Sequence, residues 1–427
     1  MIAKVLDARA RHAERHRPTG FGFALADSIH YLDGAKWDEV ARGQSVFLQR
    51  EYFAALESAL PGNLQMRYAI LFRGSRPVAA TAMQLVQISV EQISSGEAGS
   101  EGNRRKQWLR ENFPTARKLR AQVKQRVMVC GNLLSWGFHA AAFANGEDQA
   151  ALWPGIAEAI YRVRRAERLS GQTNLVMVKD ICDGQMSGCE ALGRFSYRAL
   201  ETEPNMVLEI RPEWRTYEDY LASLDGSYRK SARKIFKEVE AAGCVVEQVK
   251  GIEQWADAIH SLYLQVHENA SLRLVTLPVG YLPAFERAAG NSFRTTLVRR
   301  GEETLGFVTT VKDGDTAIAY YIGFDRAAAA SGIPIYLRLM HATVADAIGF
   351  GCKRLSLGRT ALEPKSRLGA RPEKTSVLLR HRVPALNWLV RGLLQVIPHE
   401  EPPDRHPFKK QNPEPRTQKP AGGVGAE

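Results

Sequence analysis

The fold class is indicated first by residues 293–324, FRTTLVRRGEETLGFVTTVKDGDTAIAYYIGF. This stretch contains three apolar runs separated by Gly-Glu-Glu and Asp-Gly-Asp turn sequences, at residues 293–299, 305–311 and 316–324. Apolar runs bounded by such turns predict a meander of antiparallel strands. A helix over residues 334–349 and a buried strand over residues 354–357 are predicted to follow it.

The first half of the chain repeats this order. Residues 63–93 predict a hairpin, residues 126–134 a third strand, and a helix near Pro154 leads to a buried strand at residues 175–178. One constant offset relates three positions of this half to three of the second half: Pro154, Gly171 and Leu175 to Pro334, Gly351 and Leu355. Proline near a helix start and glycine after its end are common signals. The repeat therefore predicts two related domains, as a chain of 427 residues allows.

Changes in composition set the predicted boundaries. Residues 94–125 are rich in Gly, Glu, Lys and Arg without an apolar period, which predicts an exposed insertion. The sequence after residue 398 has a composition typical of disorder. The expected divisions are a basic N-terminal tail at 1–20, an N-terminal domain at 21–205, a C-terminal domain at 206–398 and a disordered tail at 399–427.

The composition restricts the class of protein. Lys and Arg number 58 against 46 Asp and Glu, and the net charge of +12 favours anionic partners. Five cysteines without a Cys-x-x-Cys pair predict neither a disulfide framework nor a metal site. Apolar runs of about 18 residues are missing, so we expect no transmembrane segment and a cytoplasmic protein. Residues 384–397 are amphipathic, and they are a candidate for peripheral membrane contact as well as for packing on their own domain.

Two basic clusters are candidates for ligand binding. Residues 216–243 predict a helix whose polar face carries Arg229, Lys230 and Arg233, which suits either a phosphate-rich ligand or a solvated surface. Arg359, Lys365 and Arg367 follow a predicted strand that ends at Gly358, and the ends of strands are where open α/β sheets bind ligands.

These residues carry a family resemblance. Residues 220–224, residues 228–234 and the sequence Leu-Gly-Arg-Thr at 357–360, with Lys365 and Gly369, resemble the group of the GNAT superfamily that includes the bacterial Fem-type peptidoglycan aminoacyltransferases. The resemblance covers residues 216–371. It implies an α/β fold of mixed α+β type, with two tandem GNAT-like domains. Each domain would be a mostly antiparallel central sheet flanked by helices.

The resemblance also implies an activity, which is acyl transfer from an acyl-CoA to an amine or hydroxyl without a metal. The donor would lie where the strands at 317–323 and 354–357 separate, because free strand amides there can hold its carbonyl oxygen. The implied donor-binding residues are Gly358, Arg359, Lys365, Arg367, Arg229, Lys230 and Arg233. The N-terminus of the helix near Pro334 would face the donor phosphates.

Two further functions stay open, because the loop at 325–334 has one glycine and lacks the glycine spacing of acetyl-CoA binders. One is Fem-type aminoacyl transfer from aminoacyl-tRNA to a cell-wall precursor. The other is a non-catalytic pair of domains that binds an anionic ligand.

Three residues are candidates for proton transfer: Tyr321, Glu268 and Asp325. Glu268 lies near the end of a predicted helix, and Asp325 directly follows the predicted central strand. Alternation along that strand predicts that Tyr320 and Tyr321 point to opposite faces of the sheet.

Overall fold

The computed structural model describes residues 17–89, 124–269, 273–383, 386–387 and 403–409. Within them, one sheet runs through the whole molecule in the strand order β1-β2-β3-β4-β6-β13-β7-β12-β11-β10-β9-β8, with β5 paired to β3. The strands are β1 (Gly22–Ala26), β2 (Leu64–Arg73), β3 (Arg76–Ser89), β4 (Lys124–Cys130), β5 (Ala141–Phe143), β6 (Thr173–Cys182), β7 (Arg198–Glu209), β8 (Val245–Val249), β9 (Phe293–Arg300), β10 (Glu303–Asp313), β11 (Thr316–Phe324), β12 (Arg354–Ser356) and β13 (Arg371–His381).

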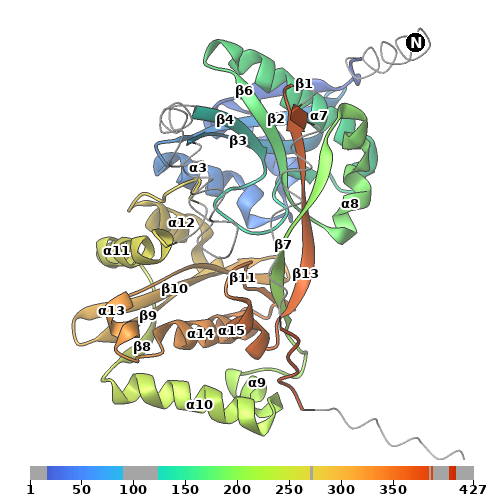
Figure 1. The fold of residues 1–427 in the computed structure, drawn as a ribbon. Helices are drawn as coiled ribbons and strands as arrows, with labels where there is room; N and C mark the ends of the chain where they lie inside the picture. The colour runs from blue at the N-terminus through green and yellow to red at the C-terminus, as the bar shows by residue number, and fades with distance from the viewer. Residues whose placement is uncertain (1–16, 90–123, 270–272, 384–385, 388–402, 410–427) are drawn as a thin grey trace, which may run out of the picture.

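Helices cover both faces of this sheet (Figure 1). In the N-terminal half they are α2 (Gly34–Ala41), α3 (Arg50–Ser58), α7 (Gln149–Ala166) and α8 (Asp183–Cys189). In the C-terminal half they are α9 (Tyr217–Ser223), α10 (Gly226–Ala241), α11 (Ala256–His267), α12 (Tyr281–Ala289), α13 (Arg326–Ala330), α14 (Ile335–Gly349) and α15 (Leu362–Arg367). No helix among the described residues is long and apolar enough to cross a bilayer.

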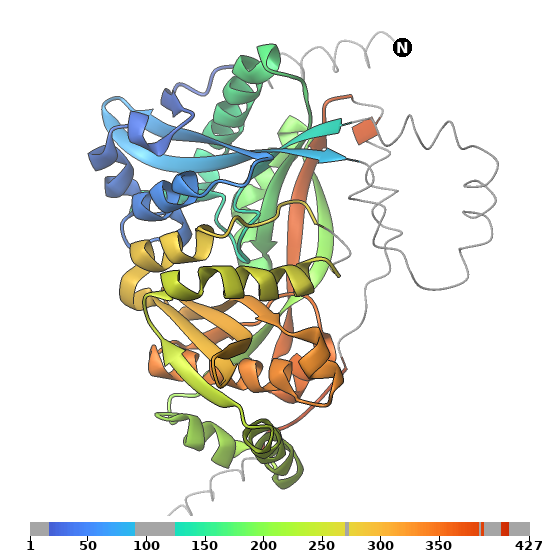
Figure 2. The same cartoon turned by 90° about the vertical axis from the view of Figure 1, so that its left-hand side faces the viewer.

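The two halves share one hydrophobic core on one face of the sheet. Alternation along β2 places Tyr68 and Ile70 in this core and sends Leu71 into a second core under α7. The shared core continues into α11 and α12, and Figure 2 shows these two helices between the two halves, next to α3. The Tyr52 and Tyr281 hydroxyls are 3.1 Å apart and those of Tyr281 and Tyr320 2.5 Å. Buried hydroxyls linked in this way connect α3, α12 and β11 across the domain boundary.

Strand β13 joins the halves a second time. It lies between β6 and β7 and is antiparallel to both, although it comes from the end of the second half. Strand β7 pairs with β13 on one side and with β12 on the other. The predicted boundary between residues 205 and 206 therefore lies inside one continuous strand.

Leu378 tests whether β13 completes the N-terminal half. Its side chain is buried in the core under α7. We expect Leu378→Ala to cost about 2–5 kcal/mol of unfolding free energy, the usual effect of removing a buried leucine side chain. Hydrogen exchange should quicken in β6 and α7 of the N-terminal half. Exchange that quickens only around α14 would show that β13 does not complete the N-terminal core.

The sequence-predicted order of elements is confirmed in both halves. Every strand pair in the described sheet is antiparallel except β4 with β6 and β11 with β12, which agrees with the mostly antiparallel tandem fold. Gly171 and Gly351 both take positive φ after a helix, as the repeat predicts. The two helix starts differ, because Pro154 lies inside α7 whereas Pro334 is the N-cap of α14.

The structure divides one predicted helix in two and includes part of the predicted tail. The helix predicted at 216–243 is two helices, because Asp225 starts α10 anew by accepting from the Gly226 amide. Within the predicted disordered tail, Phe408 packs against Trp214 and Tyr220, so residues 403–409 are part of the C-terminal domain. Most of the predicted insertion at 94–125 and of the amphipathic stretch at 384–397 lies outside the described residues.

Candidate functional site

Strands β11 and β12 separate soon after they meet. Their parallel pairing is confined to three residue pairs, from Thr316 with Arg354 to Ile318 with Ser356. Beyond Ile318, the edge of β11 that faces β12 pairs with no other described strand. Backbone amides on such an edge are donors available to a ligand, since buried amides otherwise need partners.

A β-bulge in β11 marks the same place. The register with β10 shifts between Val308 and Thr310, so Tyr320 and Tyr321 together stand opposite Thr309. The Thr309 hydroxyl accepts from the Tyr321 amide at 3.0 Å. The predicted alternation was wrong, because a bulge breaks the two-residue period. Both tyrosine rings lie on one side of the sheet, with centroids 4.6 Å apart.

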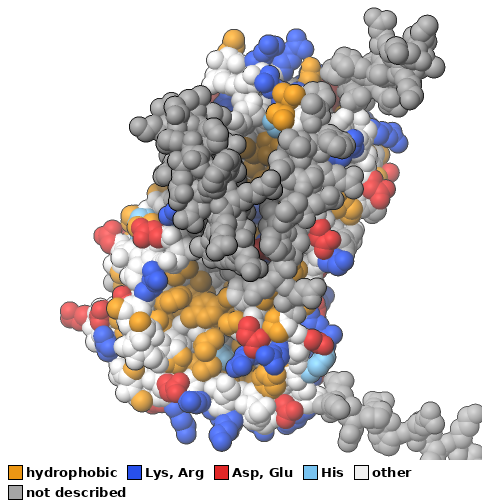
Figure 3. Space-filling model, viewed as in Figure 1, with side chains coloured by type: hydrophobic (Ala, Val, Ile, Leu, Met, Phe, Trp, Pro, Cys, Tyr) orange, Lys and Arg blue, Asp and Glu red, His pale blue; other side chains and the backbone are white. Residues whose placement is uncertain are grey.

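A cavity of about 280 Å³ lies between α10, α14 and α15. Most of its wall is apolar: Ala232, Ile235, Leu337, Met340, Pro364 and Leu368. Arg367 and Arg405 add charge to the wall, and both donate to the single carboxylate of Glu363 at 2.9 Å. Two guanidinium groups that share one carboxylate leave a net positive charge for an anionic ligand group. Figure 3 shows hydrophobic side chains gathered on this half of the molecule, next to charged ones.

His341 supplies a polar group in the cavity wall. It comes from α14, is 6% exposed, and its Nδ1 lies 2.8 Å from the Tyr217 hydroxyl. Burial, with a smaller contribution from Arg338, lowers the pKa of His341 to about 4, so the ring is neutral at neutral pH. Burial raises the pKa of Tyr217, which keeps its hydroxyl protonated and able to donate to Nδ1. The Nε2 hydrogen of His341 is then available to a carbonyl oxygen of a ligand.

Lys365 is buried on α15, the helix that follows β12 after the loop at residues 357–361. The residue is 3% exposed, and its ammonium, which has no ion pair or hydrogen bond within the described residues, keeps some contact with solvent. Burial lowers the pKa of Lys365 to about 7, against a weak opposing effect of Glu203. The neighbouring Ser366 hydroxyl is also buried without a partner. Unpartnered buried polar groups destabilise a fold, and they are concentrated at functional sites.

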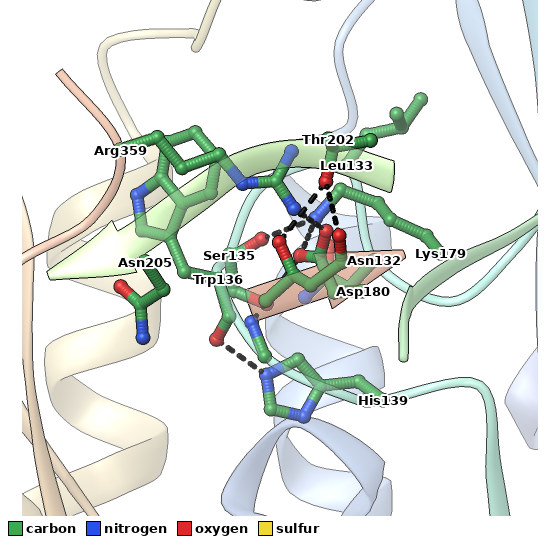
Figure 4. A network of polar contacts seen from close by, with 12 residues as sticks. Asn132, Leu133, Ser135, Trp136, His139, Lys179, Asp180, Thr202, Asn205 and Arg359 are labelled. Atoms are coloured by element: carbon green, nitrogen blue, oxygen red, sulfur yellow. Dashed lines mark hydrogen bonds and ion pairs between the residues drawn. The ribbon is translucent and has the colours of Figure 1, made fainter. Parts of the chain in front are cut away.

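A second polar cluster lies where the two halves meet (Figure 4). Asp180 of β6 accepts from Lys179 and from Arg359, which belongs to the loop after β12. The Trp136 ring lies against both cations, 5.4 Å from the Lys179 Nζ and 5.2 Å from the Arg359 guanidinium carbon. Trp136 also packs against Gly358, where an added Cβ would come within 3.3 Å of the indole nitrogen. The N-terminal half therefore holds the loop that leads from β12 to α15.

Comparisons with known proteins agree with this geometry. Residues 226–370 match the family described as Acetyltransferase (GNAT) domain. The crystal structure of FemX aligns over 86% of this chain and 100% of its own, with 8% identity and a TM-score of 0.52. Residues 226–370 thus contain a GNAT acetyltransferase domain, and the chain as a whole shares the fold of FemX. At such low identity, the likeness to FemX concerns the fold alone.

Two other structures have lower TM-scores. A tandem GNAT protein from the clavulanic acid biosynthesis pathway aligns over 85% of this chain and 99% of its own, with 13% identity and a TM-score of 0.47. The C-terminal domain of a putative lysylphosphatidylglycerol synthetase from Agrobacterium fabrum aligns over 84% and 95%, with 10% identity and a TM-score of 0.46. A search of curated proteins found no match.

In the GNAT fold the predicted donor-binding residues lie in three places. Arg367 lines the cavity and Lys365 is buried beside it. Gly358 and Arg359 belong to the cluster at the domain boundary. The three α10 residues lie apart from the cavity wall: Lys230 and Arg233 are exposed, and half-buried Arg229 donates to the Ala222 carbonyl.

The three residues predicted for proton transfer have other contacts in this GNAT fold. Asp325 accepts from the Ala328 amide at 2.7 Å and caps α13. Glu268 is exposed at the end of α11. The Tyr321 hydroxyl donates to the Leu134 carbonyl at 3.3 Å, and thus contacts the N-terminal half. A role in catalysis stays a prediction for each of them.

Several residues of the two sites were missed in the sequence, namely His341, Tyr217, Arg405, Lys179, Asp180 and Trp136. His341 lies on a helix that was correctly predicted, but its neutral state depends mainly on burial, which is set by tertiary packing that the sequence does not reveal. Lys179 and Asp180 directly follow the predicted buried strand at 175–178. Charged residues at the end of a buried strand are a signal that could have been used.

Proposed function

We propose that this GNAT-superfamily protein is an acyltransferase that moves an acyl group from an acyl-CoA donor to an amine or hydroxyl. The observation that carries the proposal is the early separation of β11 and β12, in the half of the molecule that also has the cavity between α10, α14 and α15. In this arrangement the free edge of β11 holds the donor carbonyl, and the apolar wall of the cavity takes the donor's flexible arm. Arg367 and Arg405 face its phosphates.

Lys365 fits the proton transfer that the reaction needs. The amine or hydroxyl attacks the carbonyl carbon, the carbon–sulfur bond breaks, and coenzyme A leaves as its thiol. A group with a pKa of about 7 is present in both protonation states near neutral pH, so it can accept the proton of the nucleophile. We assign this role to Lys365 in preference to the exposed Glu268 and the capping Asp325.

A second candidate function is aminoacyl transfer from aminoacyl-tRNA to a cell-wall precursor, as in Fem-type enzymes. It is favoured by the exposed cations on the outer face of α10, including Lys230, Arg233 and Lys237. The assay that separates the two candidates measures binding of acyl-CoA and of aminoacyl-tRNA to the same protein. Phosphate-backbone binding on α10 would weaken steeply with salt, whereas binding of the smaller acyl-CoA in the cavity would respond less.

Ala232→Phe tests where the donor binds. Ala232 is buried in the cavity wall on α10 and belongs to the C-terminal core, so a phenylalanine there takes up cavity space at a packing cost of about 1–3 kcal/mol. We expect acyl-CoA to bind at least about tenfold more weakly, with a melting temperature that falls only by this packing cost. Lys234→Ala, on the exposed face of the same helix, is the control and should bind as the wild type does. Equal acyl-CoA binding by Ala232→Phe and the wild type would exclude this cavity as the donor site.

A further inference from the structure

The polar cluster at the domain boundary stands at a second separation of parallel strands. Strand β4 pairs with β6 up to Cys130 and Val178, and then β4 ends while β6 continues to Cys182. Lys179 and Asp180 come directly after the last pair. The N-terminal half thus places charged side chains at the position where the C-terminal half has its proposed donor site.

The charges of this cluster do not balance. Lys179 and Arg359 are two cations, and the single carboxylate of Asp180 accepts from both. Asp180 also accepts from the Gly137 amide at 3.3 Å. The next carboxylate, Asp313, is engaged by the Ser45 hydroxyl at 2.9 Å and by the Val46 amide at 2.7 Å. Two cations therefore pair with one carboxylate, in a place where Lys179 and Asp180 are both almost fully buried.

The cluster also has donors that lack partners. The Ser135 hydroxyl is 4% exposed and has no hydrogen-bond partner, although its carbonyl accepts from the Lys179 ammonium at 2.9 Å. Burial and the charge of Arg359 lower the pKa of Lys179, and nearby Asp180 opposes this effect. An additional anion would reverse that destabilisation of the charged lysine.

The backbone and the access to the cluster fit a ligand site. Asp180 has a φ of 55°, a conformation that a non-glycine residue takes at an energetic cost and that is common at binding sites. Trp136 and Arg359 are half-buried, so theirs is the side of the cluster nearest to solvent. The Trp136 ring, within 5.4 Å of both cations, adds an aromatic surface beside them.

We infer that Lys179, Arg359 and Ser135 bind an anionic group of the acceptor, a carboxylate or a phosphate, and hold it beside the donor site. The inference rests on the proposed function, because Gly358 and Arg359 lie in the loop between β12 and α15, next to Lys365. The acceptor is then an anionic amine or alcohol. Its anionic end contacts the N-terminal half while its nucleophile faces the separated ends of β11 and β12.

The test is anion binding by the full-length protein without any donor. Inorganic phosphate and glycine, which presents a carboxylate beside an amine, are titrated separately at constant ionic strength. Tryptophan fluorescence and thermal stability report binding, and Trp136→Phe identifies the signal of the indole beside the two cations. We expect saturable binding by the wild type and binding about tenfold weaker in Lys179→Met and in Arg359→Gln, because each loses a charge-assisted hydrogen bond.

Lys353→Met is the matched control, since Lys353 forms an exposed pair with Asp315 away from the cluster. It should bind both anions as the wild type does. Preference for phosphate would identify a phosphate-bearing acceptor, and preference for glycine a carboxylate-bearing one. If the wild type binds neither anion, or if Arg359→Gln binds as tightly as the wild type, the cluster is only an ion triad that joins the domains. A negative result in this anion-binding test would not contradict the proposed donor site, because Ala232→Phe tests the donor cavity independently.

Discussion

Replacing Lys365 by methionine is expected to lower acyl transfer by at least about 100-fold, the usual contribution of a positioned proton acceptor. Methionine has a similar length and shape, so it fills the buried site of Lys365 without an amine. The fold should be at least as stable, because the variant removes a buried and unpartnered polar group. Steady-state kinetics with an acyl-CoA and thermal unfolding measure the two effects.

The pH dependence of stability gives Lys365→Met a second readout. The pKa of Lys365 is about 7 in the folded protein, against an ordinary value of 10.5. Between these two values the unfolded chain binds a proton that the folded protein does not, so the unfolding free energy rises with pH. Below about pH 7 both states are protonated and the folded protein bears the full destabilisation, roughly 5 kcal/mol from the shift. The unfolding free energy of the wild type, relative to that of Lys365→Met, should therefore rise between about pH 7 and 10.5 and be constant below about pH 7.

Arg367→Met is the control for the kinetic result. It removes a cation from the same helix, but from the cavity wall. We expect it to raise the Michaelis constant for the donor more than it lowers kcat. A Lys365→Met variant that turns over as fast as the wild type would remove Lys365 from the mechanism, and the donor cavity would need another proton acceptor.

Asp180→Ala is expected to be the most destabilising single change at the domain boundary. It removes the carboxylate that accepts from Lys179 and Arg359, and it leaves buried Lys179 uncompensated. Breaking a buried pair in this way typically costs about 3–5 kcal/mol. The effect is read as a fall in the midpoint of denaturant unfolding, monitored for both halves of the molecule.

Asp315→Ala serves as the comparison, since Asp315 forms an exposed pair with Lys353 and should show little change. Asp180→Asn should lie between the two, because asparagine tolerates the left-handed backbone of residue 180 and still accepts hydrogen bonds. If Asp180→Ala is as stable as Asp315→Ala, the ion triad contributes nothing to holding the halves together.

The local pattern of the sequence predicts the elements of the C-terminal half well. The meander at 293–324 corresponds to β9, β10 and β11, and the following helix to α14. Turn residues and apolar periods are local properties, and they determine where such elements begin and end. The bulge at Tyr320 and Tyr321 was not predicted, because it depends on the pairing of Thr309 in the neighbouring strand.

Long-range pairing explains most of what the sequence did not reveal. Strand β13 was not predicted as part of the sheet of either domain. Its place between β6 and β7 depends on contacts between distant segments. The same is true of Arg359, which was predicted at a strand end but forms an ion pair with Asp180 of the other half. Partners of charged side chains are set by tertiary packing, which the sequence pattern does not encode locally.

The place of β13 has a consequence for how the protein is made. During synthesis the first half leaves the ribosome with β6 lacking its neighbour, because residues 371–381 are still to be translated. Domains generally fold as units in the order of their synthesis. Here the sheet of the N-terminal half cannot be completed before β13 is synthesised. The exposed edge of β6 is a site for mispairing in that interval, and the long loop that β13 closes slows the final step. Maturation of the first half is therefore tied to completion of the chain.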